Sequence, residues 1–203
     1  MCGRVLIGEN KDTVITGRDG RKYQPKPNGT GNPGSMLPVV TDAMPDKVQY
    51  YRWGLLTPDD DKIHSKHKHA RIESLNTVPL WRELIGHKHC IIKVQAFFEY
   101  NREQEVMYKI ERADGEHFYI AGLWDIWLDI KTNVLLPTCA MITMPPNSAM
   151  AQIHDRMPAM LERSEVKTWL NGNIGPSQRI QHLYDHACPS ERLKISVQRD
   201  GKA

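Results

Sequence analysis

The sequence predicts an α+β fold with a mostly antiparallel sheet and helices packed around it. Six segments are rich in the β-branched and aromatic residues typical of strands, and only three segments carry helix signals. A few helices beside many strands favour this class. With 203 residues, an apolar fraction of 40% and a charged fraction of 25%, the chain has the size and composition of one globular domain, residues 1–203.

The strand segments share apolar β-formers bounded by turn residues. They cover residues 48–54, 90–100, 105–111, 118–128, 138–144 and 193–198. Trp124 and Trp127 lie in one of these strands, in which residue types alternate, and both are expected in the core. The Gly- and Pro-rich stretch from Arg18 to Met36 predicts a surface loop.

The three expected helices each have a start signal or an apolar period. Residues 77–88 offer Thr77 as an N-cap, with Pro79 in the first turn. Residues 164–172 offer Ser164 as a cap and Gly172 as a stop, and a third helix is expected at residues 177–186.

The charge balance and the lack of targeting signals limit the classes of function that the protein can have. Lys plus Arg number 27 against 24 Asp plus Glu, so the net charge of +3 does not mark a general polyanion binder. Any nucleic-acid contact must then be a local basic cleft. The first residues contain no apolar run long enough for a signal peptide, and no run of about 18 apolar residues occurs. We therefore expect a cytoplasmic protein without membrane contact, associated with the nucleoid if it is bacterial. A monomer is the default expectation.

Cys2 is the first candidate for chemistry. The four cysteines, at positions 2, 90, 139 and 188, are sparse and irregularly spaced, which predicts free thiols. Removal of Met1 exposes a 1,2-aminothiol at Cys2, whose amine attacks aldehydes and whose sulfur then closes a five-membered thiazolidine. Taken alone, Cys2 is better explained as an incidental second residue, because a single motif without context is weak evidence for chemistry.

Two internal features add proton-transfer groups. The segment IHDRMP, residues 153–158, places His154 and Arg156 in a loop stopped by Pro158. Glu99 ends a strongly apolar strand, where burial would make it a general acid or base. The alternatives are a structural hydrogen-bonding turn for the loop and a solvent-facing strand end for Glu99.

The motifs together resemble one family. MCGR at the N-terminus is followed by RWGL at 52–55, ARIES at 70–74, AFFEY at 96–100, AGLWDIW at 121–127 and IHDRMPAML at 153–161. Their order and spacing are similar to those of the SOS response-associated peptidase (SRAP) family, over about residues 1–170.

The resemblance implies a barrel-like sheet and a function. Family members remove their own N-terminal residue and shield abasic sites in single-stranded DNA through a thiazolidine crosslink, with no cofactor. It implies Cys2 as the nucleophile, Glu99 as the proton-transfer group and His154 as the residue that helps open the sugar. The expected DNA contacts are Arg4, Trp53, Arg71, Arg156 and Thr143.

Two positions depart from the family pattern. His69 stands where the family usually has Asn, and we expect it to support the same chemistry with a stronger dependence on pH. Ala96 replaces a common Gly. Both departures indicate a divergent member.

Three other functions can be weighed against these residues. The histidine groups around residues 64–69, 87–90 and 182–188 are too loose for a compact zinc site, so no metal is expected. A noncatalytic single-strand binder would use Arg and Trp alone. General proteolysis is disfavoured because no specificity pocket is recognisable.

Overall fold

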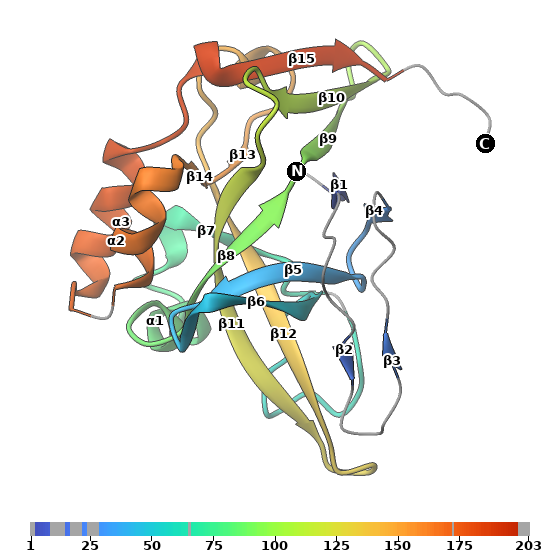
Figure 1. Ribbon diagram of the computed structural model, residues 1–203, viewed down its shortest axis with the longest axis vertical. Coiled ribbons are helices and arrows are strands. Elements are labelled where there is room, and N and C mark those ends of the chain that lie inside the picture. Colours follow the sequence, from blue (N-terminus) through green and yellow to red (C-terminus); the bar gives the residue numbers. More distant parts are fainter. Residues whose placement is uncertain are drawn as a thin grey trace.

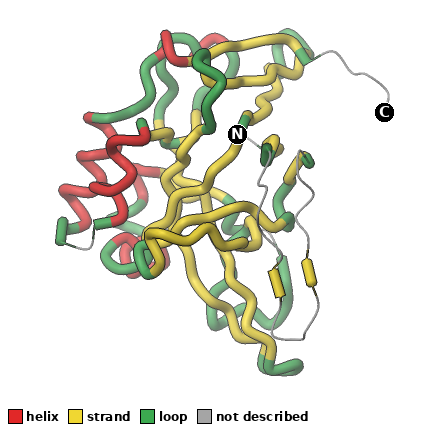
Figure 2. The backbone as a smooth tube through the Cα atoms, in the orientation of Figure 1, coloured by secondary structure: helices red, strands yellow, loops and turns green. Residues whose placement is uncertain are grey.

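The computed structural model describes residues 3–8, 15–16, 22–23, 29–64, 66–171 and 173–198 (Figures 1 and 2). Cys2 and Gly172 lie outside the described residues. The fold is α+β with a mostly antiparallel, barrel-like sheet and surrounding helices, as the sequence predicts. None of the described helices is long and apolar enough to cross a membrane.

A closed barrel forms the centre of the molecule. Its strands pair in the order β12 (Val134–Met144), β6 (Met44–Trp53), β5 (Met36–Thr41), β8 (His89–Val94) and β11 (Phe118–Asp129), and β11 returns to β12. The β12–β6 pair is parallel and the other pairs are antiparallel. The contact between β12 and β6 closes the barrel and is short, with Thr138 opposite Arg52 and Cys139 opposite Trp53.

Three short strands attach to the barrel, and the first of them, β7, carries the expected site residues His69 and Arg71. β7 (His69–Arg71) pairs in parallel with β12, and β13 (Met157–Pro158) pairs with the same strand. β14 (Met160–Leu161) pairs with β11.

A second, antiparallel sheet lies across one end of the barrel, at the top of Figure 1. Its order is β15 (Leu193–Val197), β10 (Val106–Arg112), β9 (Ala96–Asn101), β1 (Arg4–Leu6) and β4 (Thr30–Gly31). β2 (Ile15–Thr16) and β3 (Lys22–Tyr23) form a separate pair. The expectation of an unbroken loop over residues 18–36 is wrong at β3 and β4.

The expected strand at residues 90–100 is also wrong in one respect, because it is two strands in two sheets. β8 belongs to the barrel and β9 to the second sheet, and Gln95 lies between them. The amide of Gln95 donates a hydrogen bond to the carbonyl of Leu6, 2.8 Å away. Both strands are almost wholly buried, so a continuous apolar run conceals the break.

The core is one cluster of buried apolar side chains that fills the barrel and reaches under the helices. Gly122 shows how closely its strands pack, because an added Cβ would lie 2.7 Å from the carbonyl oxygen of Ala140. The thiols of Cys90, Cys139 and Cys188 are free and buried, as expected. Trp127 is buried and Trp124 lies at the edge of the core.

The helices gather on one side of the barrel (left in Figure 1). They are α1 (Pro79–Ile85), α2 (Val166–Leu170) and α3 (Pro176–Asp185), with 3-10 turns η1 (Ile72–Ser74), η2 (Met150–Gln152), η3 (Arg163–Glu165) and η4 (Ser190–Arg192). The expected caps Thr77 and Ser164 are wrong: Val78 and Glu165 occupy the cap positions, and neither makes a side-chain cap bond. Pro79 fixes the first turn of α1, and η3 runs directly into α2.

Candidate functional site

Glu99 and His154 form the centre of the candidate site. Glu99 lies on β9 and its side chain is only 4% exposed, because both faces of this strand are covered. His154 follows η2, and its Nε2 atom lies 3.6 Å from Oε1 of Glu99. The solvent-facing alternative for Glu99 is therefore wrong.

Hydrogen bonds hold the His154 loop against β9. The side-chain amide of Asn101, at the end of β9, donates to the carbonyl of Gln152 over 3.0 Å. Asn147 accepts a bond from the amide of Met150, and the carbonyl of Met150 accepts one from the amide of His154. These hydrogen bonds fix the turn that positions the imidazole of His154.

β1 brings the N-terminal end of the chain to the same place. Arg4 lies opposite Phe98 in the β1–β9 register, and Val5 lies opposite Phe97. Because Phe98 directly precedes Glu99 and Gly3 directly precedes Arg4, the start of β1 lies next to the acid. The guanidinium of Arg4 is exposed and lies 5.1 Å from the centre of the Phe98 ring.

The electrostatics of Glu99 suit proton exchange. Burial raises the pKa of this carboxyl. A carboxyl whose pKa is raised toward neutrality holds and releases a proton in the range where general acid–base catalysis is effective.

The other ring nitrogen of His154, Nδ1, faces the next two residues in the chain, Asp155 and Arg156. Nδ1 lies 2.7 Å from a carboxylate oxygen of Asp155, a side chain that is 85% exposed. The same nitrogen lies 3.1 Å from the amide of Arg156. A protonated Nδ1 bonds the carboxylate and a deprotonated one accepts from the amide, so both states of the ring have a local partner.

A second group of expected site residues meets beside β12. Thr143 lies opposite Arg71 of β7 and opposite Pro158 of β13. The guanidinium of Arg156 donates to the carbonyl of Thr143 over 2.7 Å and forms a two-pronged ion pair with Glu73, in which Nη2 and Oε2 are 2.9 Å apart. That pair lowers the pKa of Glu73.

The arginines are therefore not equivalent. Arg4 and Arg71 are exposed. Arg156 is largely covered by its partners, and a phosphate would have to compete with Glu73 for its planar fork. Glu73 was not predicted as a site residue, and its position inside the ARIES motif is the one signal that could have indicated it.

Trp53 does not lie where a DNA base could reach it. The ring has no exposed surface, and its Nε1 donates to the carbonyl of Lys68 over 2.9 Å. Stacking on a base requires an exposed ring face, so the buried ring of Trp53 does not fit the predicted contact with DNA. His69 packs edge-on against this ring, 5.8 Å between centres, and shares a face of β7 with Arg71.

An open hollow adjoins His154. It has a volume of about 270 Å³ and is lined by residues 100–103 and 151–155. Its walls come from the end of β9 and from the loop that positions His154, so a ligand bound there lies against the imidazole.

Two of the loosely grouped histidines make structural hydrogen bonds. His89 is buried, with Nε2 2.6 Å from the carbonyl of Ile85, and His64 bonds Asp60 over 2.6 Å. Near the C-terminus, His182 and His186 meet Glu165, a residue that the sequence did not indicate.

Comparison with known proteins agrees with these motifs. The family model described as SOS response associated peptidase (SRAP) matches residues 1–199. Abasic site processing protein YobE of Bacillus subtilis is 33% identical over 193 residues, which cover 90% of this chain and 88% of that protein. Abasic site processing protein YedK of Escherichia coli is 21% identical over 203 residues, with 95% and 90% covered.

Solved structures include a protein from Bacteroides thetaiotaomicron with a TM-score of 0.77 and 28% identity, covering 84% of this chain and 78% of that one. The match of the family model along nearly the whole chain, together with the relatives, identifies the family. The chain belongs to the SOS response-associated peptidase family.

Proposed function

We propose that this protein captures abasic sites in single-stranded DNA by forming a covalent thiazolidine through Cys2. The reacting form is the chain without Met1, removed by the protein itself or by an aminopeptidase. The observation that carries the proposal is the buried carboxyl of Glu99. It lies beside the imidazole of His154, on the strand that pairs with the start of β1. β1 starts with Arg4 opposite Phe98, the residue before Glu99, and Cys2 precedes Arg4 by two residues in the sequence.

The proposed reaction balances without a cofactor. The neutral amine of Cys2 attacks the aldehyde carbon of the ring-opened deoxyribose, and the resulting carbinolamine loses one water to give a Schiff base. The thiol sulfur then adds to the C=N carbon, and its proton passes to the nitrogen. One C–N and one C–S bond are formed, and one water is released.

Glu99 and His154 have separate roles in this scheme. Glu99 gives a proton to the departing hydroxyl and takes protons from the amine and thiol, which its raised pKa favours. His154 acts on the sugar ring, because its imidazole faces the hollow at residues 100–103 and 151–155. His69 contributes a polar group from β7.

The proposed DNA contacts lie on either side of this centre. Arg4 and Arg71 are exposed and hold phosphates directly. Arg156 joins them when a phosphate replaces Glu73, and Thr143 holds its guanidinium in place. We further propose that residues 1–203 act as one domain and as a monomer.

Intact-protein mass spectrometry tests the proposal. Protein lacking Met1 is incubated with a single-stranded oligonucleotide containing one abasic site, and an undamaged oligonucleotide serves as the control. We expect a heat-stable adduct whose mass is the sum of both components less one water, with the abasic strand only. Cys2→Ala should form none.

A different result has a defined meaning. An adduct of unchanged yield in Cys2→Ala would overturn the chemistry. Reversible binding of both oligonucleotides without any adduct would identify a noncatalytic single-strand binder on the same scaffold.

A further inference from the structure

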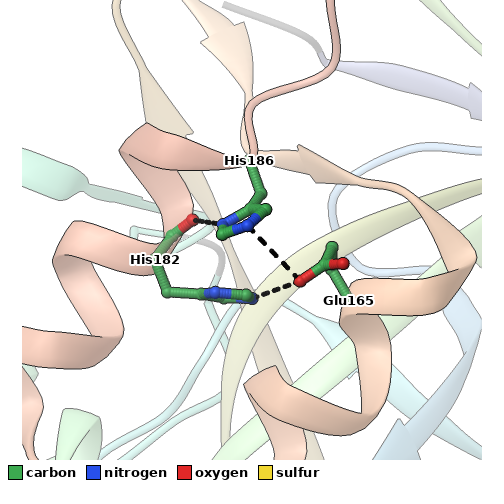
Figure 3. Close-up of side chains that lie close together, drawn as sticks. All are labelled: Glu165, His182 and His186. Atoms are coloured by element: carbon green, nitrogen blue, oxygen red, sulfur yellow. Dashed lines mark hydrogen bonds and ion pairs between the residues drawn. The ribbon is translucent and has the colours of Figure 1, made fainter.

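Three potential metal ligands meet on the helical side of the molecule. Oε2 of Glu165 lies 3.7 Å from Nε2 of His182 and 3.7 Å from Nε2 of His186, and all three atoms lie within 4.8 Å of one another (Figure 3). Glu165 ends η3, whereas both histidines come from α3 and its C-cap. None of these elements carries Glu99 or His154.

The separations differ from those of hydrogen bonds. An N–H···O bond spans about 2.7–3.2 Å, so neither imidazole is hydrogen-bonded to this carboxylate oxygen. Atoms that share a tetrahedral zinc ion at bond lengths of about 2.0–2.2 Å lie about 3.3–3.6 Å apart. The two nitrogen–oxygen separations of 3.7 Å are close to that spacing, and the two Nε2 atoms lie within 4.8 Å of each other.

The free lone pairs point into the cluster. Nδ1 of His186 lies 3.1 Å from the carbonyl oxygen of His182, and because a carbonyl only accepts, Nδ1 carries the proton. In the neutral ring, Nε2 of His186 then bears a lone pair that faces Glu165. Nε2 of His182 is buried and has no hydrogen-bond partner among the described residues. A bound ion would satisfy it.

The scaffold holds the ligands before any ion binds. The two histidines are four residues apart, so they share one face at the end of α3. Fully buried Arg179 fastens α3 to the end of α2 and the segment that follows it, by donating to the carbonyls of Trp169, Asn171 and Ile174. The indole of Trp169 in turn donates to the carbonyl of Cys90 in the barrel, over 2.9 Å.

We propose that Glu165, His182 and His186 bind one divalent transition-metal ion, with zinc as the best fit and water as the fourth ligand. Two imidazoles and one carboxylate match zinc, whereas magnesium and calcium prefer oxygen ligands. His186 is 44% exposed, so it can make the small movement that closes the set, and water reaches the open position. The ion would fasten α3 to the start of α2.

The test is calorimetric titration of metal-free protein with Zn²⁺, and with Mg²⁺ in parallel. All variants carry Cys2→Ala, because an N-terminal aminothiol would itself chelate zinc. We expect one Zn²⁺ per chain and no Mg²⁺ binding. His186→Ala and Glu165→Gln should each weaken zinc binding about 10- to 100-fold. His87→Ala is the matched control, because His87 is an exposed histidine outside the cluster.

Zinc affinity equal in His186→Ala, Glu165→Gln and the control, or no zinc binding at all, would overturn the proposal. Melting curves without metal verify that each variant is folded, and zinc should raise the Tm of the Cys2→Ala parent but not of His186→Ala. Since the Cys2→Ala background cannot form a thiazolidine, failure of this proposal and failure of the proposed function remain separate results.

Discussion

Two groups in this molecule combine carboxylate and imidazole, with opposite patterns of burial. In the first, Glu99 is buried and His154 is partly exposed. In the second, His182 is buried while Glu165 is partly exposed. Residues of the same types therefore have different chemistry available to them.

Burial disfavours the charged form in both places, with opposite effects on the pKa. It raises the pKa of Glu99, which favours a protonated acid. It lowers the pKa of His182, which favours a neutral imidazole with a free lone pair. The identity of the buried partner therefore determines whether such a pair suits proton transfer or metal ligation.

The largest expected effect comes from removing the buried acid. Glu99→Gln keeps the shape of the side chain but cannot transfer a proton, so we expect the rate of thiazolidine formation to fall about 10²- to 10⁴-fold. The measurement is single-turnover crosslinking to an abasic oligonucleotide. Glu83→Gln, an exposed change on α1, is the control and should retain the parent rate. Equal rates in all three proteins would remove Glu99 from the mechanism.

The same substitution gives a stability prediction with a defined sign. Because the pKa of Glu99 is higher in the folded than in the unfolded chain, the folded state binds more protons between the two values, and stability falls as pH rises through that window. Glu99→Gln should therefore match the parent below about pH 4 and become progressively more stable than it above. Urea unfolding from pH 4 to 8 measures this difference. A gain in stability that is constant from pH 4 to 8 would contradict a raised pKa for Glu99.

Glu73 offers a third carboxylate, one that is exposed and paired with an arginine. Glu73→Gln should release Arg156 and strengthen binding of undamaged single-stranded DNA by up to about fivefold, the scale of a surface ion pair. Fluorescence anisotropy over a range of salt concentrations is the measurement. Weaker binding would mean instead that Glu73 holds Arg156 in its DNA-binding position.

His69 should give the smallest effect. His69→Asn replaces a titrating ring with a neutral amide, so we expect a flatter pH profile of crosslinking between about pH 5 and 8. The rate itself should change less than about tenfold, since His69 is not the main proton donor. A rate and pH profile identical to the parent would refute a role for His69.

Several features of the fold and site followed from local sequence. The strand segments and the three helices were recognisable because side-chain periodicity and turn residues act over a few positions. The break at Gln95 was not recognisable, because strands buried on both faces show no alternation. The caps at Val78 and Glu165 also escaped prediction, because a proline and a 3-10 turn take the place of a capping side chain.

The sequence by itself determined the family, the fold class and the set of candidate chemical groups, because motifs and residue types are local properties. Only the tertiary structure decided which groups meet and which are buried. It buried Trp53, paired Arg156 with Glu73, placed Glu99 against His154 and brought Glu165 to two histidines. Burial and long-range contacts depend on how strands and helices pack, and pKa values follow from both.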